Sequence, residues 1–160
     1  MAEDTVIPHL GSRSRGRTFV GLRFSDISER FPKKPRAPGI YEIHTLSGLA
    51  LKVGISGDIR ERLIRHGQSK QSGLKFKVGA SADEPCDVES KRSILAKHLY
   101  FDRSIDPRYD LRSQLGRQRF LEEQCRITVE ITASREVARG LEEGRERRGS
   151  YRYCGDVIKR

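Results

Sequence analysis

The pattern of apolar and polar positions predicts a β-hairpin near the middle of the chain. Residues 39–46 and 49–55 are rich in Ile, Val, Leu and Tyr, and Ser47 and Gly48 stand between these two runs. Two apolar runs separated by a short turn containing Gly are typical of a hairpin.

The expected turn sets the pairing of the two strands. With a two-residue turn, Ile43 faces Lys52 and Tyr41 faces Gly54, so that Tyr41 and Lys52 share one face. We expect the core side to be the other face, which carries Ile40, Leu51 and Val53, with Glu42 as a polar exception. The Tyr41 side is then open to a ligand, and Gly54 leaves room for that ligand.

Helical spacing follows the hairpin. Ile59 and Leu63 lie four residues apart after a possible N-cap at Asp58, which predicts a helix to about His66. Further on, residues 74–80 are compatible with a strand, and residues 86–101 and 109–124 look helical.

The C-terminal third predicts one more strand and helix. Residues 125–132 alternate apolar and polar positions, as in a half-buried strand. Ser134 is a possible cap of an amphipathic helix with Val137 and Leu141 on its apolar face and Gly149 at its end. Residues 151–159 are compatible with a returning edge strand.

The front of the chain differs from the rest. Residues 1–17 mix Gly, Ser and Arg without a period, a short apolar piece spans 18–24, and Ser25 is a possible cap of a brief helix. We therefore expect an irregular basic extension over 1–37 and one domain over 38–160. The predicted fold class is α/β, with a small central sheet that starts with the hairpin and is flanked by helices.

Charge changes this picture by indicating a partner. Lys and Arg total 32 against 22 Asp and Glu, a net charge of +10, which favours a polyanion such as nucleic acid. The three cysteines show no spacing typical of zinc sites or disulfide frameworks. Because no apolar run approaches the ~20 residues of a membrane span, we expect a cytoplasmic protein without a membrane partner or organic cofactor.

Four side chains near the hairpin have chemistry that suits a phosphodiester. Arg62 and His66 lie one turn apart on a single helix face, distinct from the Ile59 and Leu63 face that we expect to dock on the sheet. The predicted register brings Tyr41 and Lys52 toward them. A guanidinium grips phosphate oxygens, and a phenolate or imidazole takes a proton from attacking water. The alternative is an ordinary strand tyrosine beside a solvated helix face.

The same residues resemble the GIY-YIG nuclease superfamily. Gly39-Ile40-Tyr41 reads GIY, and Lys52-Val53-Gly54 follows after ten residues at the YIG position. Arg62-Leu63 and His66 then match the downstream part of the motif. Two departures are the Lys52 in place of the second motif tyrosine and the absence of asparagine from the whole chain.

The resemblance implies a metal site and an activity. Val137 to Glu142 resembles the family's E-A-x-x-L-E helix, so Glu142 is the expected ligand of one Mg²⁺, with Glu143 and Glu89 as fallbacks. The implied function is a metal-dependent endonuclease acting on DNA. The expected catalytic set is Tyr41, Lys52, Arg62, His66 and Glu142, and the expected DNA contacts are Arg36, Lys52, Arg62, Arg65 and Arg145.

Two other functions stay open at this level. One is a DNA-binding module that kept the fold and lost the chemistry. The other is a basic scaffold protein whose partner is not nucleic acid. The sequence does not indicate an oligomeric state.

Overall fold

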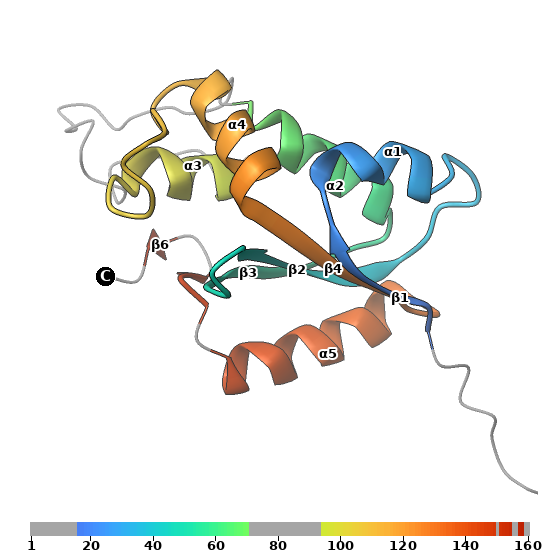
Figure 1. Cartoon of the computed structure of the whole chain (residues 1–160). Helices are drawn as coiled ribbons and strands as arrows, with labels where there is room; N and C mark the ends of the chain where they lie inside the picture. The colour runs from blue at the N-terminus through green and yellow to red at the C-terminus, as the bar shows by residue number, and fades with distance from the viewer. Residues whose placement is uncertain (1–15, 71–93, 150, 155–156, 159–160) are drawn as a thin grey trace, which may run out of the picture.

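The computed structural model describes residues 16–70, 94–149, 151–154 and 157–158 of the 160-residue chain. Within these residues the fold is α/β, with a four-stranded antiparallel sheet in the order β1-β4-β2-β3 and five α-helices (Figure 1). None of the described helices has the length and apolar composition needed to cross a bilayer.

The elements follow one another along the chain in this order: β1 (Thr18–Leu22), the 3-10 helix η1 (Phe24–Asp26), α1 (Ile27–Arg30), β2 (Gly39–Thr45), β3 (Ala50–Ser56), α2 (Ile59–Gln68), α3 (Ile94–Phe101), α4 (Gln114–Gln124), β4 (Cys125–Ile131), α5 (Arg135–Arg148), β5 (Tyr153–Cys154) and β6 (Val157–Ile158).

The predicted hairpin is formed by β2 and β3, and its register is confirmed for the outer pairs. Tyr41 pairs with Gly54 and Ile43 pairs with Lys52. The turn itself differs, because a register shift follows Ile43 and the amide of Thr45 donates to the carbonyl of Leu49. The hairpin is also not the start of the sheet, since β1 precedes it and pairs with β4.

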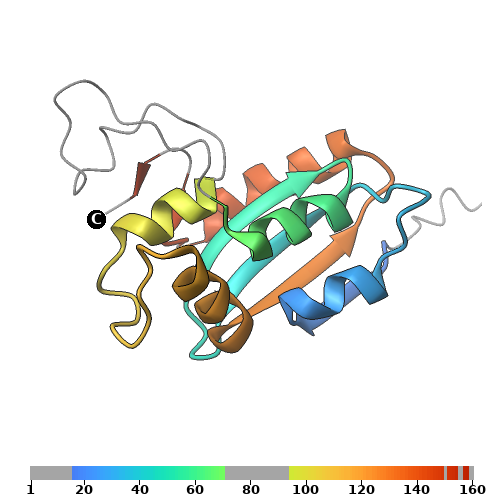
Figure 2. The same ribbon diagram turned by 90° about the horizontal axis from the view of Figure 1, so that it is seen from above.

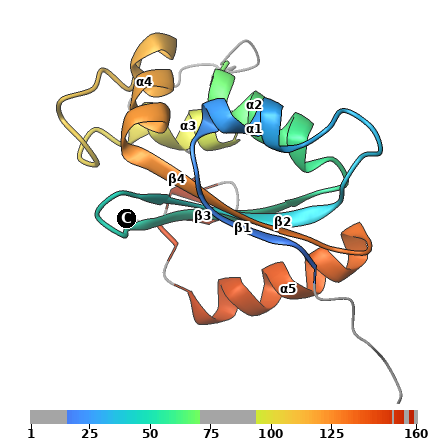
Figure 3. The same cartoon turned by 45° about the vertical axis from the view of Figure 1, so that its right-hand side comes forward.

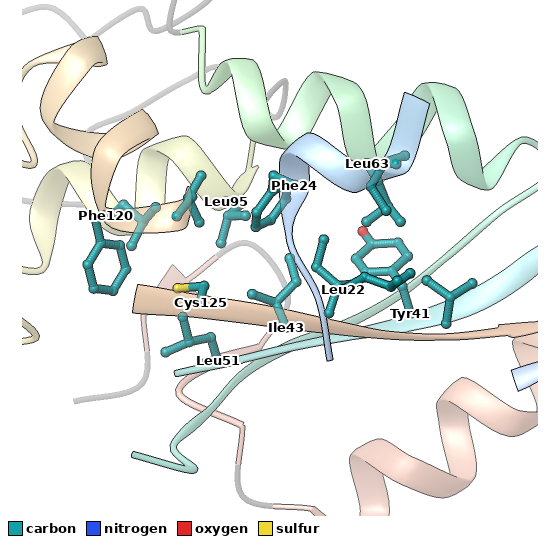
Figure 4. Close-up of a cluster of buried hydrophobic side chains, with 14 of the residues drawn as sticks. Leu22, Phe24, Tyr41, Ile43, Leu51, Leu63, Leu95, Phe120 and Cys125 are labelled. Atoms are coloured by element: carbon teal, nitrogen blue, oxygen red, sulfur yellow. The ribbon is translucent and has the colours of Figure 1, made fainter. Parts of the chain in front are cut away.

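Helices cover both faces of the sheet. Figures 1 and 3 show α5 on one side and α1 to α4 on the other. The larger core lies under α1 to α4 and includes Tyr41, Ile43 and Leu51 (Figure 4). Ile40 and Val53 pack with Ala138 of α5 on the other face of the sheet. The expectation that one hairpin face stays open was therefore wrong, and Leu51 belongs to the face opposite the one expected, at the site of the register shift.

Local capping predictions hold at two helices. The Asp58 carboxylate accepts from the amide of Glu61 at the start of α2, and the Ser134 hydroxyl accepts from the amide of Val137 at the start of α5. The predicted apolar face of α5 was wrong in one position, because Val137 is 50% exposed and Ala138 is fully buried. Leu141 packs partly buried on the same side as Ala138.

The N-terminal part of the fold reaches further than the boundary expected at Pro38. Leu22, Phe24, Ile27 and Phe31 are buried in the larger core, so the segment before residue 38 contributes to the same unit. Ser25 does not cap the brief helix, and its amide and hydroxyl instead donate to the Glu122 carboxylate of α4.

The predictions for residues 74–124 and for the C-terminal segment are confirmed only in part. The regions expected to be helical at 86–101 and 109–124 contain the shorter helices α3 and α4, and the strand expected at 74–80 lies outside the described residues. The C-terminal segment does not join the main sheet, because β5 and β6 pair with each other in a separate two-stranded ladder.

Candidate functional site

Tyr41 lies in β2 with its ring directly over β3. Its side chain is only 2% exposed. A Cβ atom at position 54 would lie 2.6 Å from the ring Cζ of Tyr41, so the glycine is what allows the ring to lie across the edge strand. The space that Gly54 leaves is thus filled by the tyrosine itself rather than by a ligand.

His66 is the hydrogen-bonding partner of this phenol. The Tyr41 hydroxyl lies 2.7 Å from His66 Nε2, and the two ring centroids are 5.4 Å apart. His66 is buried on the inner side of α2, next to the Ile59 and Leu63 positions that dock the helix. The two groups therefore meet as predicted, but the helix face expected for His66 was wrong, because His66 is buried on the docking side of α2 whereas Arg62 is exposed.

The protonation states of the pair follow from burial. Burial, as the largest cause, and the charges of Lys52 and Arg62 together lower the pKa of His66 to about 3. Burial raises the pKa of Tyr41 above its ordinary value. Near neutral pH the site therefore holds a neutral imidazole against a neutral phenol.

Arg62 and Glu142 act on the same phenol from opposite sides of the sheet. The Arg62 charge lowers the pKa of Tyr41 and the Glu142 charge raises it, both as smaller effects than burial. Arg62 is on α2 and Glu142 is on α5, and both helices contact the edge strand β3. Arg62 is exposed and forms no ion pair with any residue in the described part of the chain.

Lys52 lies beside these groups on β3 and is partly exposed. Its charge lowers the pKa of His66 and also favours the ionised form of Glu142. The cation that lowers the pKa of the Tyr41 phenol is Arg62. All five predicted catalytic residues nevertheless interact electrostatically with at least one other member of the set.

Glu142 is a half-buried carboxylate with a neighbour of the same charge. Burial raises its pKa, and Glu146, one helical turn later, raises it further. Lys52, Arg135 and Arg139 act in the opposite direction. A carboxylate that is partly desolvated beside another carboxylate is stabilised by a nearby cation, which suits a hard divalent ion.

The donor set for a metal is small. Among the described residues there is no cluster of three or more His, Cys, Asp or Glu side chains with metal-binding geometry. The residues present fit only an ion that is held by one carboxylate and completes its shell with water and phosphate oxygens, as Mg²⁺ often does. Of the fallback ligands, Glu143 is exposed on α5 and Glu89 lies outside the described residues.

The basic residues predicted to contact DNA have different surroundings. Arg36 is 74% exposed in its side chain and lies 3.6 Å from Asp58, and Arg65 is exposed and paired with Glu61 along α2. Arg145 is different, because it faces the sheet and bridges Glu42 at 3.1 Å and Glu130 at 2.6 Å. It therefore links α5 to β2 and β4, and its expected contact with DNA stays a prediction.

The segment that follows α5 contacts Asp102, the residue after α3. The Arg152 guanidinium donates to Asp102 at 2.8 Å, and the Tyr153 hydroxyl donates to the same carboxylate at 2.7 Å. These contacts hold the segment after α5 against the end of α3.

Sequence reasoning missed the buried residue Arg117 of α4. It is 1% exposed and donates to Ser69, Leu111 and Arg112, and burial lowers its pKa to about 10. No local pattern distinguishes it from the exposed arginines of the same helix. Glu146 was also missed, although its spacing of four from Glu142 was a visible signal.

Comparison with protein-family models, curated protein sequences and solved structures finds no match to this chain. The resemblance to the GIY-YIG superfamily therefore depends on the motif residues themselves.

Proposed function

We propose that this chain is a metal-dependent endonuclease that hydrolyses phosphodiester bonds in DNA, with a GIY-YIG type of site. The observation that carries the proposal is the hydrogen bond between the Tyr41 hydroxyl and His66 Nε2, at 2.7 Å. The charges of Arg62 and Glu142 also shift the pKa of this phenol. These four residues were selected from the sequence, and they come from three different elements.

Tyr41 and His66 supply a proton relay. In the tautomer with its proton on Nδ1, the neutral imidazole accepts the phenol proton at Nε2 while the phenol oxygen takes a proton from water. The neutral state of His66 is needed for this step, since an imidazolium cannot accept. A bound phosphate would offset the Lys52 and Arg62 charges that now disfavour the imidazolium.

Arg62 and Lys52 supply positive charge where the reaction builds negative charge. Arg62 is exposed on α2, so its guanidinium is available to the non-bridging oxygens of a phosphate. Lys52 lies on the edge strand β3, and its charge lowers the pKa values of both His66 and Glu142. Together they favour a dianionic transition state over the monoanionic ground state.

Glu142 is the residue that would hold the divalent ion. Its raised pKa reflects burial and the Glu146 charge, which are the conditions that a cation relieves. When bound, Mg²⁺ acts as a Lewis acid on a phosphate oxygen and on the departing oxygen.

A second function, a DNA-binding module without cleavage, is favoured by one observation. Tyr41 is 2% exposed and His66 is 9% exposed, so attacking water needs a local opening to reach the phenol. In a binding module, the basic surface would bind DNA and no proton would be transferred through Tyr41 and His66.

Plasmid nicking separates the two functions. The wild-type protein is incubated with supercoiled DNA with and without Mg²⁺, beside Tyr41→Phe, which keeps the ring and removes the hydroxyl. Glu142→Gln is compared with Glu136→Gln, an exposed glutamate near the start of the same helix. The nuclease proposal expects nicking that needs Mg²⁺ and survives only in the Glu136 variant.

Two other outcomes would count against it. Retention of DNA without nicking at any Mg²⁺ concentration supports the binding module. Failure to retain DNA even near 50 mM salt, where phosphate contacts are strong, supports a partner other than nucleic acid.

A further inference from the structure

A pocket lies at the connection between α3 and α4, away from the Tyr41 site. Its volume is about 370 Å³, within the range of about 300–1,000 Å³ typical of small-ligand sites. Its lining includes Tyr100, Arg103, Tyr109, Asp110, Leu111 and Arg112. Figure 2 shows this connection at the end of the helical layer, joining α3 to α4.

The walls of the pocket combine aromatic rings with cations. The Arg112 guanidinium lies 5.6 Å from the centroid of the Tyr100 ring, so this ring already binds a cation through its π face. Next to the pocket, the Arg108 guanidinium lies 5.8 Å from the Tyr109 ring and is paired with Asp106. Aromatic faces beside arginines are the chemistry that binds unstacked bases together with their phosphates.

Asp110 restricts the ligand. An ionised carboxylate accepts hydrogen bonds and repels phosphate, so this wall suits the N–H groups of a base. The phosphate would then lie on the side of Arg103 and Arg112, which are exposed. A nucleotide therefore satisfies the wall and the rim together, whereas an isolated phosphate satisfies only the rim.

Hydrogen bonds fix the walls in place. The Tyr109 hydroxyl donates to Glu123 at 2.6 Å and accepts from Gln124 at 3.0 Å. The buried Arg117 donates to the carbonyl oxygens of Leu111 and Arg112.

Arg117 also joins the pocket to α2. It donates to the hydroxyl and the carbonyl oxygen of Ser69, the residue that ends this helix. Because α2 carries Arg62 and His66, the pocket keeps a set position relative to the candidate site.

We propose that this pocket binds one unpaired nucleotide of the DNA, stacked on Tyr100 with its phosphate on Arg112. The inference rests on the proposed action on DNA and adds a preference for substrates with a flipped or bulged base. A base stacked on Tyr100 displaces the Arg112 guanidinium from the ring and makes it available to the phosphate.

The test uses binding without metal, so cleavage is not required. DNA hairpins with one bulged 2-aminopurine are titrated with the full chain in EDTA, and 2-aminopurine fluorescence reports stacking. The chain contains no tryptophan, so the probe signal is well separated from that of the protein.

Tyr100→Leu should weaken binding to the bulged hairpin by about 5- to 150-fold, the equivalent of the ~1–3 kcal/mol that stacking contributes per base. Tyr100→Phe keeps the ring and should bind like the wild type. Arg112→Gln should also weaken binding, whereas Arg119→Gln, an exposed arginine of α4 outside the pocket, should behave like any lost surface charge. Circular dichroism checks that each variant is folded.

Two results would overturn the inference. One is equal affinity of the wild type and Tyr100→Leu for the bulged hairpin. The other is an equal loss on a fully paired duplex, which would indicate a general effect on DNA binding. If the chain nicks plasmid but shows either of these results, the nuclease proposal stands and the nucleotide-pocket proposal is wrong. If the chain binds the bulged hairpin preferentially but does not nick plasmid, the pocket proposal stands and the nuclease proposal is wrong.

Discussion

Gly54→Ala tests the geometry of the candidate site most directly. The backbone at Gly54 is compatible with alanine, because the positive φ angles among the described glycines are at Gly21 and Gly48. The stability lost in Gly54→Ala therefore comes from the contacts of the added Cβ and not from backbone strain. That atom would lie 2.6 Å from the ring Cζ of Tyr41, whereas ordinary contacts begin near 3.4 Å, so the ring must shift by about 1 Å.

The magnitude follows from what the shift disrupts. Overpacking in a close-packed core costs about 1–3 kcal/mol, and loss of the buried hydrogen bond to His66 costs about 1–3 kcal/mol more. Part of this is offset by the lower backbone entropy that alanine has in the unfolded chain, about 0.5–1 kcal/mol. We expect a net loss of about 2–4 kcal/mol in the free energy of unfolding.

Urea unfolding followed by circular dichroism measures this loss. The control is Gly140→Ala, since a Cβ there meets nothing within 4 Å on an exposed helix position. It should stabilise the protein by about 0.5–1 kcal/mol. In a Tyr41→Leu background the cost of Gly54→Ala should fall below about 1 kcal/mol. A Gly54→Ala cost within about 0.5 kcal/mol of zero, or one unchanged by Tyr41→Leu, would refute the placement of the ring.

Three further predictions concern charged and titrating groups. His66 stays neutral in the fold down to a pKa of about 3 while the unfolded chain takes up the proton near 6.5, so the unfolding free energy should fall as pH drops through this window, by up to about 1.4 kcal/mol per unit. Acid titration of stability in His66→Gln should show a shallower slope. Arg145→Gln leaves two partly buried carboxylates without their cation and should cost about 1–2 kcal/mol in urea, against less than about 0.5 for the exposed Arg147→Gln. Arg117→Met leaves three buried oxygen acceptors without a donor and should cost about 2–4 kcal/mol, and a thermal melt within a few degrees of wild type would contradict this.

The part of the candidate site that could be predicted is the part set by short spacings. Strand alternation and the Ser47-Gly48 turn were enough to place Tyr41 opposite Gly54, although the turn has a different length. The Asp58 cap set the start of α2, whereas the burial of His66 on the docking side of this helix was not predicted. These features depend on neighbours within a few residues, where local sterics and hydrogen bonding decide the outcome.

The burial of Tyr41 and the role of Arg145 could not be predicted in this way. The hairpin has apolar residues on both faces, and the sequence pattern does not show which face a distant helix will cover. Arg145 finds Glu42 at a separation of 103 residues, and only the packing of α5 brings the two together. An exposed helical arginine and a bridging one look alike along the chain.

The amino-acid sequence by itself determined the hairpin, the two capped helices and the strand over 125–131, and it supplied the candidate groups for the proposed phosphate chemistry. Tertiary structure decided that helices cover both sheet faces, that the phenol is closed off by His66, and that a nucleotide-sized pocket lies between α3 and α4. The reason is physical. Periodicity and capping are interactions within one or two turns, whereas burial, desolvation and pKa depend on which distant segments exclude water from a side chain.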